Sequence, residues 1–127
     1  MDQVLIARCG QVAYEDARDL QKRLEVARHA GEIPDVLLLL EHPPTYTKGR
    51  RTEPGELGMG EDWYRMQGIE VCETDRGGRV TYHGPGQLVG YPIVSLKEYG
   101  GRVKDYVCNL ERLMIDSLAP YDISAEV

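Results

Sequence analysis

The stretch DRGGRVTYHGPGQLVGYPIVSL, residues Asp75–Leu96, places a glycine-rich segment directly before an apolar one. The segment Arg76–Gln87 contains four glycines, one proline, two arginines and one histidine. Leu88–Ser95 is apolar and of strand length, so we predict a buried strand there. A flexible, basic loop next to a buried strand indicates a ligand site beside a buried sheet.

The residue types in this loop suggest which ligand groups it could hold. Gly77 and Gly78 lack a Cβ, so a ligand can approach their backbone closely, and their N–H groups could stabilise a developing oxyanion. Arg76 and Arg79 can pair with phosphate or carboxylate, and His83 can donate, accept or shuttle a proton. These residues predict a site for an anion and a carbonyl group. The alternative is a glycine-rich hairpin with solvated arginines.

Two common nucleotide-binding motifs are excluded. The loop contains no GxxxxGK[ST] sequence, so it is not a P-loop, and no GxGxxG opens a helix as dinucleotide-binding folds require. Pro85 instead fixes a turn between Gly84 and Gly86.

The composition is that of one ordinary globular domain. The 127 residues are 42% hydrophobic and 28% charged, with a net charge of −6 and a pI of about 5.0. The acidic balance argues against nucleic-acid and anionic-membrane binding. No apolar run approaches the roughly 18 residues of a membrane span. The N-terminus lacks a secretory signal, and the three cysteines have no metal-binding spacing, so we expect a cytoplasmic protein with reduced thiols.

Hydrophobic periodicity predicts alternating strands and helices. Strands are expected at Val4–Arg8, Val36–Leu40, Ile69–Thr74 and Leu88–Ser95, with a further strand beginning at Ile123. Helices are expected at 13–27 and 103–118, with one or two turns at Glu61–Gly68, and Thr45–Gly60 is expected to be a long loop. Val36–Leu40 is continuously apolar, which is typical of a strand buried on both faces. This order predicts an α+β fold with one mixed sheet and helices packed on it.

Several ungapped segments resemble one family. RGGRVTYHGPGQLVGYPIVSL is similar to the signature of the lipoyl(octanoyl) transferases, which move an octanoyl group from acyl carrier protein to lipoyl domains. GEIPDVLLLLEHPPTYTKGRR, GIEVCETDRGG and the helix VKDYVCNLERLMIDSLAPYDI agree with that family in type and order. The resemblance implies a biotin and lipoate protein ligase fold with an acyl tunnel. It also implies that residues 1–127 are a single, incomplete catalytic domain, the N-terminal two thirds of the family's domain, truncated at the C-terminus.

The resemblance also implies the roles of particular residues. The family's acyl site is lined by the segment that matches Arg76, Gly77, Gly78, Arg79, Val80, Thr81, Tyr82 and His83. In the family the acyl group passes through a thioester on a cysteine whose pKa a nearby lysine lowers. Both residues belong to the family's C-terminal third, past Val127, so we expect no catalytic residue in this chain. Neither a metal nor a cofactor is implied, because the thioester is already activated.

The implied partners are octanoyl-acyl carrier protein as donor, and as acceptors the lipoyl domains of 2-oxoacid dehydrogenases and the glycine cleavage H protein. Lys48, Arg50 and Arg51 form a basic cluster in an acidic chain, and Arg76 and Arg79 join it if the two loops are neighbours. We expect this cluster to dock the acidic carrier protein. The alternative is a solvated loop.

The other chemically notable residues have structural interpretations. We expect Cys9, Cys72 and Cys108 to be buried or partly buried thiols; Cys72 as a substitute nucleophile has no lysine or histidine beside it in sequence. His42 is expected to be a polar residue at a strand end, His29 to lie at a helix C-terminus, and Tyr46 and Trp63 to pack. Two other functions stay open: a non-catalytic, truncated or split acyl-binding module, and an ATP-dependent lipoate ligase, which fits Thr81–Gln87 less well.

Overall fold

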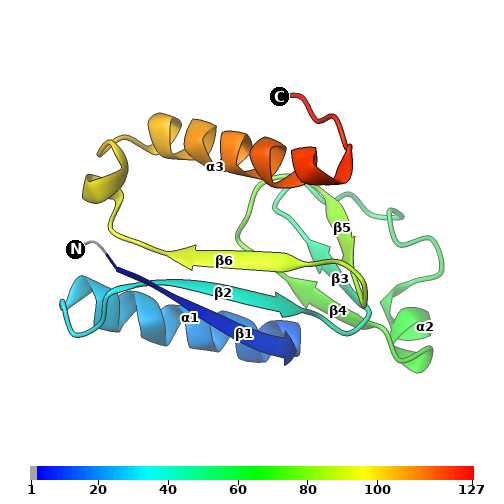
Figure 1. The fold of residues 1–127 in the computed structure, drawn as a ribbon. Helices are drawn as coiled ribbons and strands as arrows, with labels where there is room; N and C mark the ends of the chain where they lie inside the picture. The colour runs from blue at the N-terminus through cyan, green and yellow to red at the C-terminus, as the bar shows by residue number, and fades with distance from the viewer. Residues whose placement is uncertain (1–2) are drawn as a thin grey trace. The chain divides into compact units, whose positions relative to one another are not determined.

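The structure is a computed structural model that describes residues 3–127, and it consists of two compact units (Figure 1). The first unit runs to Ile93 and contains every strand of the described chain. The second unit, Val94–Val127, is helical. No helix among the described residues is long and apolar enough to cross a membrane.

The first unit begins with a three-stranded sheet in the order β1-β2-β6. β1 (Val4–Gln11) runs parallel to β2 (Asp35–Glu41), and β2 pairs antiparallel with β6 (Val89–Ile93). The helix α1 (Tyr14–His29) connects β1 to β2, as parallel neighbours require. It ends as expected, with Gly31 in a left-handed conformation at φ 75°.

The core of this unit lies between α1 and the first sheet. Side chains alternate between the two faces of a strand, so Val36, Leu38 and Leu40 of β2 point to one face and are almost completely buried with Ala17 of α1. Leu37 and Leu39 are only half-buried, so the apolar side chains of β2 are fully buried on one face alone and not, as expected, on both.

A second three-stranded sheet in the same unit has the order β4-β3-β5. β3 (Thr45–Lys48) runs parallel to β4 (Glu70–Glu73) and antiparallel to β5 (Val80–His83). The short helix α2 (Glu61–Met66) precedes β4, as predicted. The chain passes from the first sheet to the second at His42–Pro44, and it returns through the turn after His83. Residues near these two connections therefore come from both sheets.

The second unit contains the predicted long helix. α3 (Val103–Leu118) lies between two short 3₁₀ segments, Leu96–Tyr99 and Ala119–Tyr121. The rings of Tyr99 and Tyr106 meet edge to face, with centroids 6.2 Å apart. Pro120 follows the helix end at Leu118, as expected for a residue that cannot continue a helix.

Three sequence-based expectations about the fold are wrong. The single mixed sheet is two sheets, because β3 and β5 form within segments that were expected to be loops. These strands are only four residues long, and each exists because the other lies opposite it, with Tyr46 facing Tyr82. The strand expected from Ile123 does not form, because no described strand pairs with 123–127.

Candidate acyl site and the neighbouring pocket

The predicted ligand loop, Arg76–His83, is half loop and half strand. Arg76–Arg79 bends between β4 and β5, and Val80–His83 is β5 itself. The Arg76 guanidinium reaches across β3 and donates to the carbonyl oxygen of Thr47 at 2.9 Å and to its hydroxyl at 2.7 Å. Thr47 is fully buried. Arg76 therefore fastens the bend to the centre of the second sheet.

The same bend is held by backbone contacts from the segment after β3. Arg50 N–H donates to the Arg76 carbonyl at 3.0 Å, and Arg51 N–H donates to the Gly78 carbonyl at 2.9 Å. The two basic segments are therefore neighbours, which is the condition under which Arg76 and Arg79 join the basic cluster. Gly49 lies at the closest approach, where a Cβ would be 2.4 Å from the Gly78 carbonyl oxygen and 2.6 Å from that of Gly77. Only glycine fits there without displacing backbone.

We predict that Gly49→Ala lowers the free energy of unfolding by about 1–3 kcal/mol, because the added methyl group forces the two backbone segments apart. Urea unfolding measures the change. Gly58→Ala is the matched control, since a Cβ at Gly58 has no heavy atom within 4 Å. Equal unfolding midpoints for the two variants would show that this close approach does not exist in solution.

Arg79 also has partners within the chain. Its guanidinium donates to Glu56 at 3.1 Å and to Glu53 at 3.2 Å, two residues of the segment between β3 and α2. An anionic ligand at Arg79 must therefore compete with two carboxylates. Gly77, by contrast, is open, because a Cβ built on it would meet no heavy atom within 4 Å. The bend is held on one side and open at Gly77.

His83, at the end of β5, belongs to an aromatic cluster that sequence reasoning missed. Its ring stacks on Tyr14 with centroids 6.5 Å apart and meets the edge of His42 at 6.0 Å. His42 directly follows β2, which confirms its position at a strand end, but it is fully buried. His42 Nδ1 lies 2.7 Å from the Val12 carbonyl oxygen and Nε2 lies 2.8 Å from the Tyr91 hydroxyl.

These members of the cluster are far apart in sequence: His42 and Tyr91 are separated by 49 positions. The one sequence feature that could have indicated this cluster is the position of His42 between a buried apolar strand and two prolines. Burial raises the pKa of the Tyr91 hydroxyl to about 12, with a smaller contribution from Tyr14, so this hydroxyl stays protonated at neutral pH and can donate.

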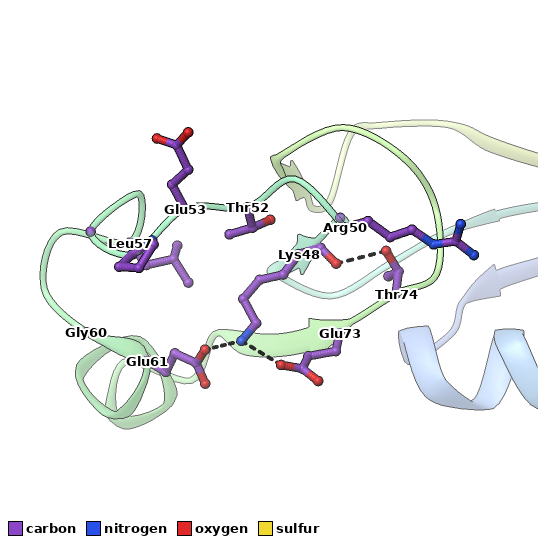
Figure 2. Close-up of a pocket in the computed structure, with 12 residues that line it drawn as sticks. Lys48, Arg50, Thr52, Glu53, Leu57, Gly60, Glu61, Glu73 and Thr74 are labelled. Carbon is purple, nitrogen blue, oxygen red and sulfur yellow. Dashed lines mark hydrogen bonds and ion pairs between the residues drawn. The ribbon is translucent and has the colours of Figure 1, made fainter.

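A pocket of about 510 Å³ lies beside the segment after β3 (Figure 2). Its walls come from the end of β3, the start of α2 and the end of β4, and the lining residues are Lys48, Gly49, Arg50, Thr52, Glu53, Pro54, Gly55, Leu57, Gly60, Glu61, Glu73 and Thr74. None of the residues 76–83 lines it. The structure therefore divides the predicted residues, with Lys48 and Arg50 in this pocket and the expected acyl segment outside it.

Lys48 is not the free surface cation that a docking patch needs. Its ammonium contacts Glu61 and lies 3.1 Å from the Glu73 carboxylate, as Figure 2 shows. The hydrogen bond to Glu61, helped by Glu73, raises the pKa of Lys48, and the same bond lowers the pKa of the Glu61 carboxyl. Arg50 and Arg51 are exposed, and neither forms an ion pair within residues 3–127. They are the accessible part of the predicted basic cluster.

The cysteines differ from one another. Cys9 is half-buried on β1 and Cys72 is buried on β4, as expected. The expectation of burial is wrong for Cys108, which is exposed on α3, a helix without a buried residue. Burial, and then the carboxylates of Glu15 and Glu70, raise the pKa of Cys72 to about 11. Such a thiol is the opposite of an activated nucleophile.

No three or more His, Cys, Asp or Glu side chains within residues 3–127 are grouped to hold a metal ion. His29 is exposed at the end of α1, where the helix dipole suits a cation. Tyr46 packs between Tyr64 and Tyr82, with both ring centroids 5.2 Å away. Trp63 also packs, edge to face on Tyr64 with centroids 5.1 Å apart, although it is 40% exposed.

Comparison with known proteins identifies the family. Residues 13–127 match the family model of the lipoyl protein ligase A/B catalytic domain. The chain belongs to this family. The match continues across both compact units and includes α3 and every strand from β2 onward, whereas β1 precedes it.

Curated relatives of the family domain are named octanoyltransferase. The protein of Rubrobacter xylanophilus is 50% identical over 118 residues, which cover 90% of this chain and 51% of the relative. That of Chloroflexus aurantiacus is 46% identical over 92% of this chain and 52% of its own length. The chain thus spans about half the length of these relatives. The resemblance to octanoyltransferases found in the sequence is confirmed.

A solved structure supports the fold. A Thermoplasma acidophilum protein described as a lipoate protein ligase aligns with a TM-score of 0.66 over 98% of this chain and 52% of its own. The two sequences are only 13% identical, so the likeness concerns the fold alone. The predicted α+β fold of the lipoate protein ligase type is confirmed.

Proposed function

We propose that this chain is the acyl-binding part of an octanoyltransferase that takes an octanoyl group from octanoyl-acyl carrier protein and delivers it to a lysine of a lipoyl domain. The observation that carries the proposal is the 50% identity to a curated octanoyltransferase over 118 residues. The acyl group passes through a cysteine thioester. We place the nucleophilic cysteine and its lysine in the half of the relatives that this chain does not span. The three unpaired cysteines fit a cytoplasmic protein.

We assign the octanoyl group to Arg76–His83. Support comes from the way this segment is held: Arg76 and the residues after β3 fix it, while Gly77 has open space beside it. An octanoyl tail has six methylenes and one methyl, and burying them contributes about 5–6 kcal/mol before the costs of binding. The polar backbone of the bend is available for the carbonyl group.

We predict that Gly77→Val weakens binding of N-methyloctanamide, a neutral octanoyl ligand, at least about tenfold, equivalent to ~1.4 kcal/mol. The variant should fold, because a Cβ at Gly77 meets nothing within 4 Å and its φ is not left-handed. Any loss of affinity therefore reports a clash with the ligand. Titration followed by NMR measures the affinity, with Gly58→Val as control. Unchanged affinity in folded Gly77→Val protein would remove Gly77 from the acyl site.

For the donor we propose docking at Arg50 and Arg51, which are exposed. Acyl carrier protein is acidic, so local positive charge speeds encounter even though this chain carries a net charge of −6. Replacing both arginines by glutamate should slow association several-fold at low salt and flatten its salt dependence. Lys22→Glu with Arg23→Glu makes the same charge change on exposed residues of α1 and should leave the rate closer to wild type. Equal rates for the two double variants would show that the arginines are merely solvated.

The second candidate function is acyl binding without catalysis by this chain. The raised pKa of Cys72 favours this function, because a thiol that stays protonated at neutral pH is a poor nucleophile. Incubation with octanoyl-acyl carrier protein, followed by measurement of the intact mass, tests this function, which predicts no gain of an octanoyl group. A parallel reaction with ATP and free octanoate distinguishes these two functions from a lipoate ligase, which would use both reagents.

A further inference from the structure

The two clustered histidines are held in different ways. His42 is fully buried, and both of its ring nitrogens have partners. The Val12 carbonyl can only accept, so Nδ1 of His42 carries the hydrogen, and Nε2 accepts from the Tyr91 hydroxyl. The ring therefore has one fixed tautomer and no free hydrogen-bonding group. Its remaining contribution to the cluster is ring packing against Tyr14, His83 and Tyr91.

His83 has one partner and one free nitrogen. Its Nδ1 lies 2.5 Å from Oε1 of Gln87, and an amide oxygen accepts, so Nδ1 carries the hydrogen here too. The bond made by one ring nitrogen decides the state of the other, so Nε2 is left as an acceptor. No group within residues 3–127 bonds to Nε2 of His83, and the ring is only half-buried.

The turn after β5 explains how Gln87 reaches His83. Gln87 N–H donates to the Gly84 carbonyl at 3.1 Å, which closes a four-residue turn. Pro85 suits the second position of this turn, and Gly86, at φ 92°, suits the third, where a left-handed residue is needed. Gly86 N–H is anchored to the Glu41 carboxylate at 2.9 Å. The turn thus returns the chain so that Gln87 lies beside the imidazole.

The faces and edge of the His83 ring are also restrained. The Tyr14 ring stacks on it with an interplanar angle of 14°, and His42 meets it at 71°. Because His42 is itself locked by Val12 and Tyr91, these contacts fix the plane of His83. A half-buried imidazole with a fixed plane, a fixed tautomer and one open acceptor is suited to bind an N–H donor.

We propose that Gln87 is a positioning residue that holds His83 in the Nδ1–H tautomer, and that Nε2 of His83 accepts a hydrogen bond from the nitrogen that is acylated at this site. That nitrogen is a primary amine before transfer and a secondary amide after it. The proposal rests on the proposed function for the identity of this ligand. The tautomer of His83 and the role of Gln87 do not depend on it.

The first arm of the test reads the tautomer directly. The sequence has three histidines, so ¹⁵N–¹H correlation of the imidazoles, with His29→Gln and His83→Gln for assignment, identifies the His83 signals. We expect the Nδ1–H form in the wild-type chain and in Gln67→Leu, which alters an exposed glutamine. Gln87→Leu should give mixed tautomers, whereas Gln87→Glu keeps an acceptor and should keep the Nδ1–H form. The Nε2–H form in the wild type would overturn the proposal without any variant.

The second arm compares N-methyloctanamide with methyl octanoate, which have the same shape but differ in one N–H donor. The wild type and Gln67→Leu should prefer the amide by about fivefold, the effect of one ordinary hydrogen bond. Gln87→Leu should lose this preference while binding the ester as before. Equal preference in wild type and Gln87→Leu overturns the acceptor role. If neither ligand binds, the acyl site and the acceptor role are wrong, while positioning by Gln87 is upheld if Gln87→Leu gives mixed tautomers. The Nδ1–H form alone in Gln87→Leu overturns the positioning role.

Discussion

Iodoacetamide near pH 7.5 should modify Cys108 and leave Cys72 unmodified in the folded chain. Cys72 is 7% exposed on β4, and burial together with Glu15 and Glu70 raises its pKa to about 11. Only about one Cys72 thiol in 3,000 is then ionised at that pH, and the thiolate is the reacting form. Cys108 is exposed on α3. Mass spectrometry of peptides from the alkylated protein measures both sites.

The same argument applies to octanoyl transfer. Cys72 should gain no octanoyl group from octanoyl-acyl carrier protein, because its thiolate is about a hundredfold scarcer than that of a thiol with the ordinary value of 9.0. Reactivity should rise about tenfold per pH unit until the pH approaches 11. A gain of one octanoyl group that Cys72→Ser alone abolishes would make Cys72 the nucleophile and contradict this account.

Asp35→Ala should lower the free energy of unfolding by about 3–5 kcal/mol. Asp35, the first residue of β2, is fully buried, and the Arg28 guanidinium near the end of α1 donates to it at 2.5 Å. The Arg28 side chain is itself only 15% exposed. Removing the carboxylate leaves a mostly buried cation without this partner at the point where α1 joins the first sheet.

Urea unfolding measures this loss. Asp19→Ala removes a carboxylate from an exposed position on the same helix and should change stability by less than about 0.5 kcal/mol. A loss below about 1 kcal/mol for Asp35→Ala would mean that the ion pair is solvated in solution. In that case this ion pair does not hold β2 to α1.

The elements that could be predicted from sequence are those with a strong local pattern. The apolar run of β2 and the apolar residues that recur with a 3.6-residue period in α1 and α3 can be recognised from the local sequence alone. β3 and β5 have no such pattern. Each is four residues beside glycine or proline, and pairing between them across more than 30 positions makes them strands. That pairing also separates the chain into two sheets.

The candidate site was predictable to a similar degree. The glycines and arginines of the bend suggested a ligand site, and Pro85 was correctly expected to fix a turn. The hydrogen-bond partners of the arginines were not predictable, because Arg79 bonds to Glu53 and Glu56, more than 20 positions away in the sequence. From the sequence, His42 could only be given a structural role at a strand end. Its contacts to Tyr91 and His83 were not predictable, because they depend on how the two sheets connect.

The central claim is that the segment Arg76–His83 binds an octanoyl group. The most direct test is a titration of the wild-type chain with N-methyloctanamide, followed residue by residue in the amide NMR spectrum. We predict saturable binding with the largest shifts at residues 76–83, which Gly77→Val weakens at least about tenfold. Absence of saturable binding, or shifts centred on the pocket between Thr52 and Glu61, would contradict the claim.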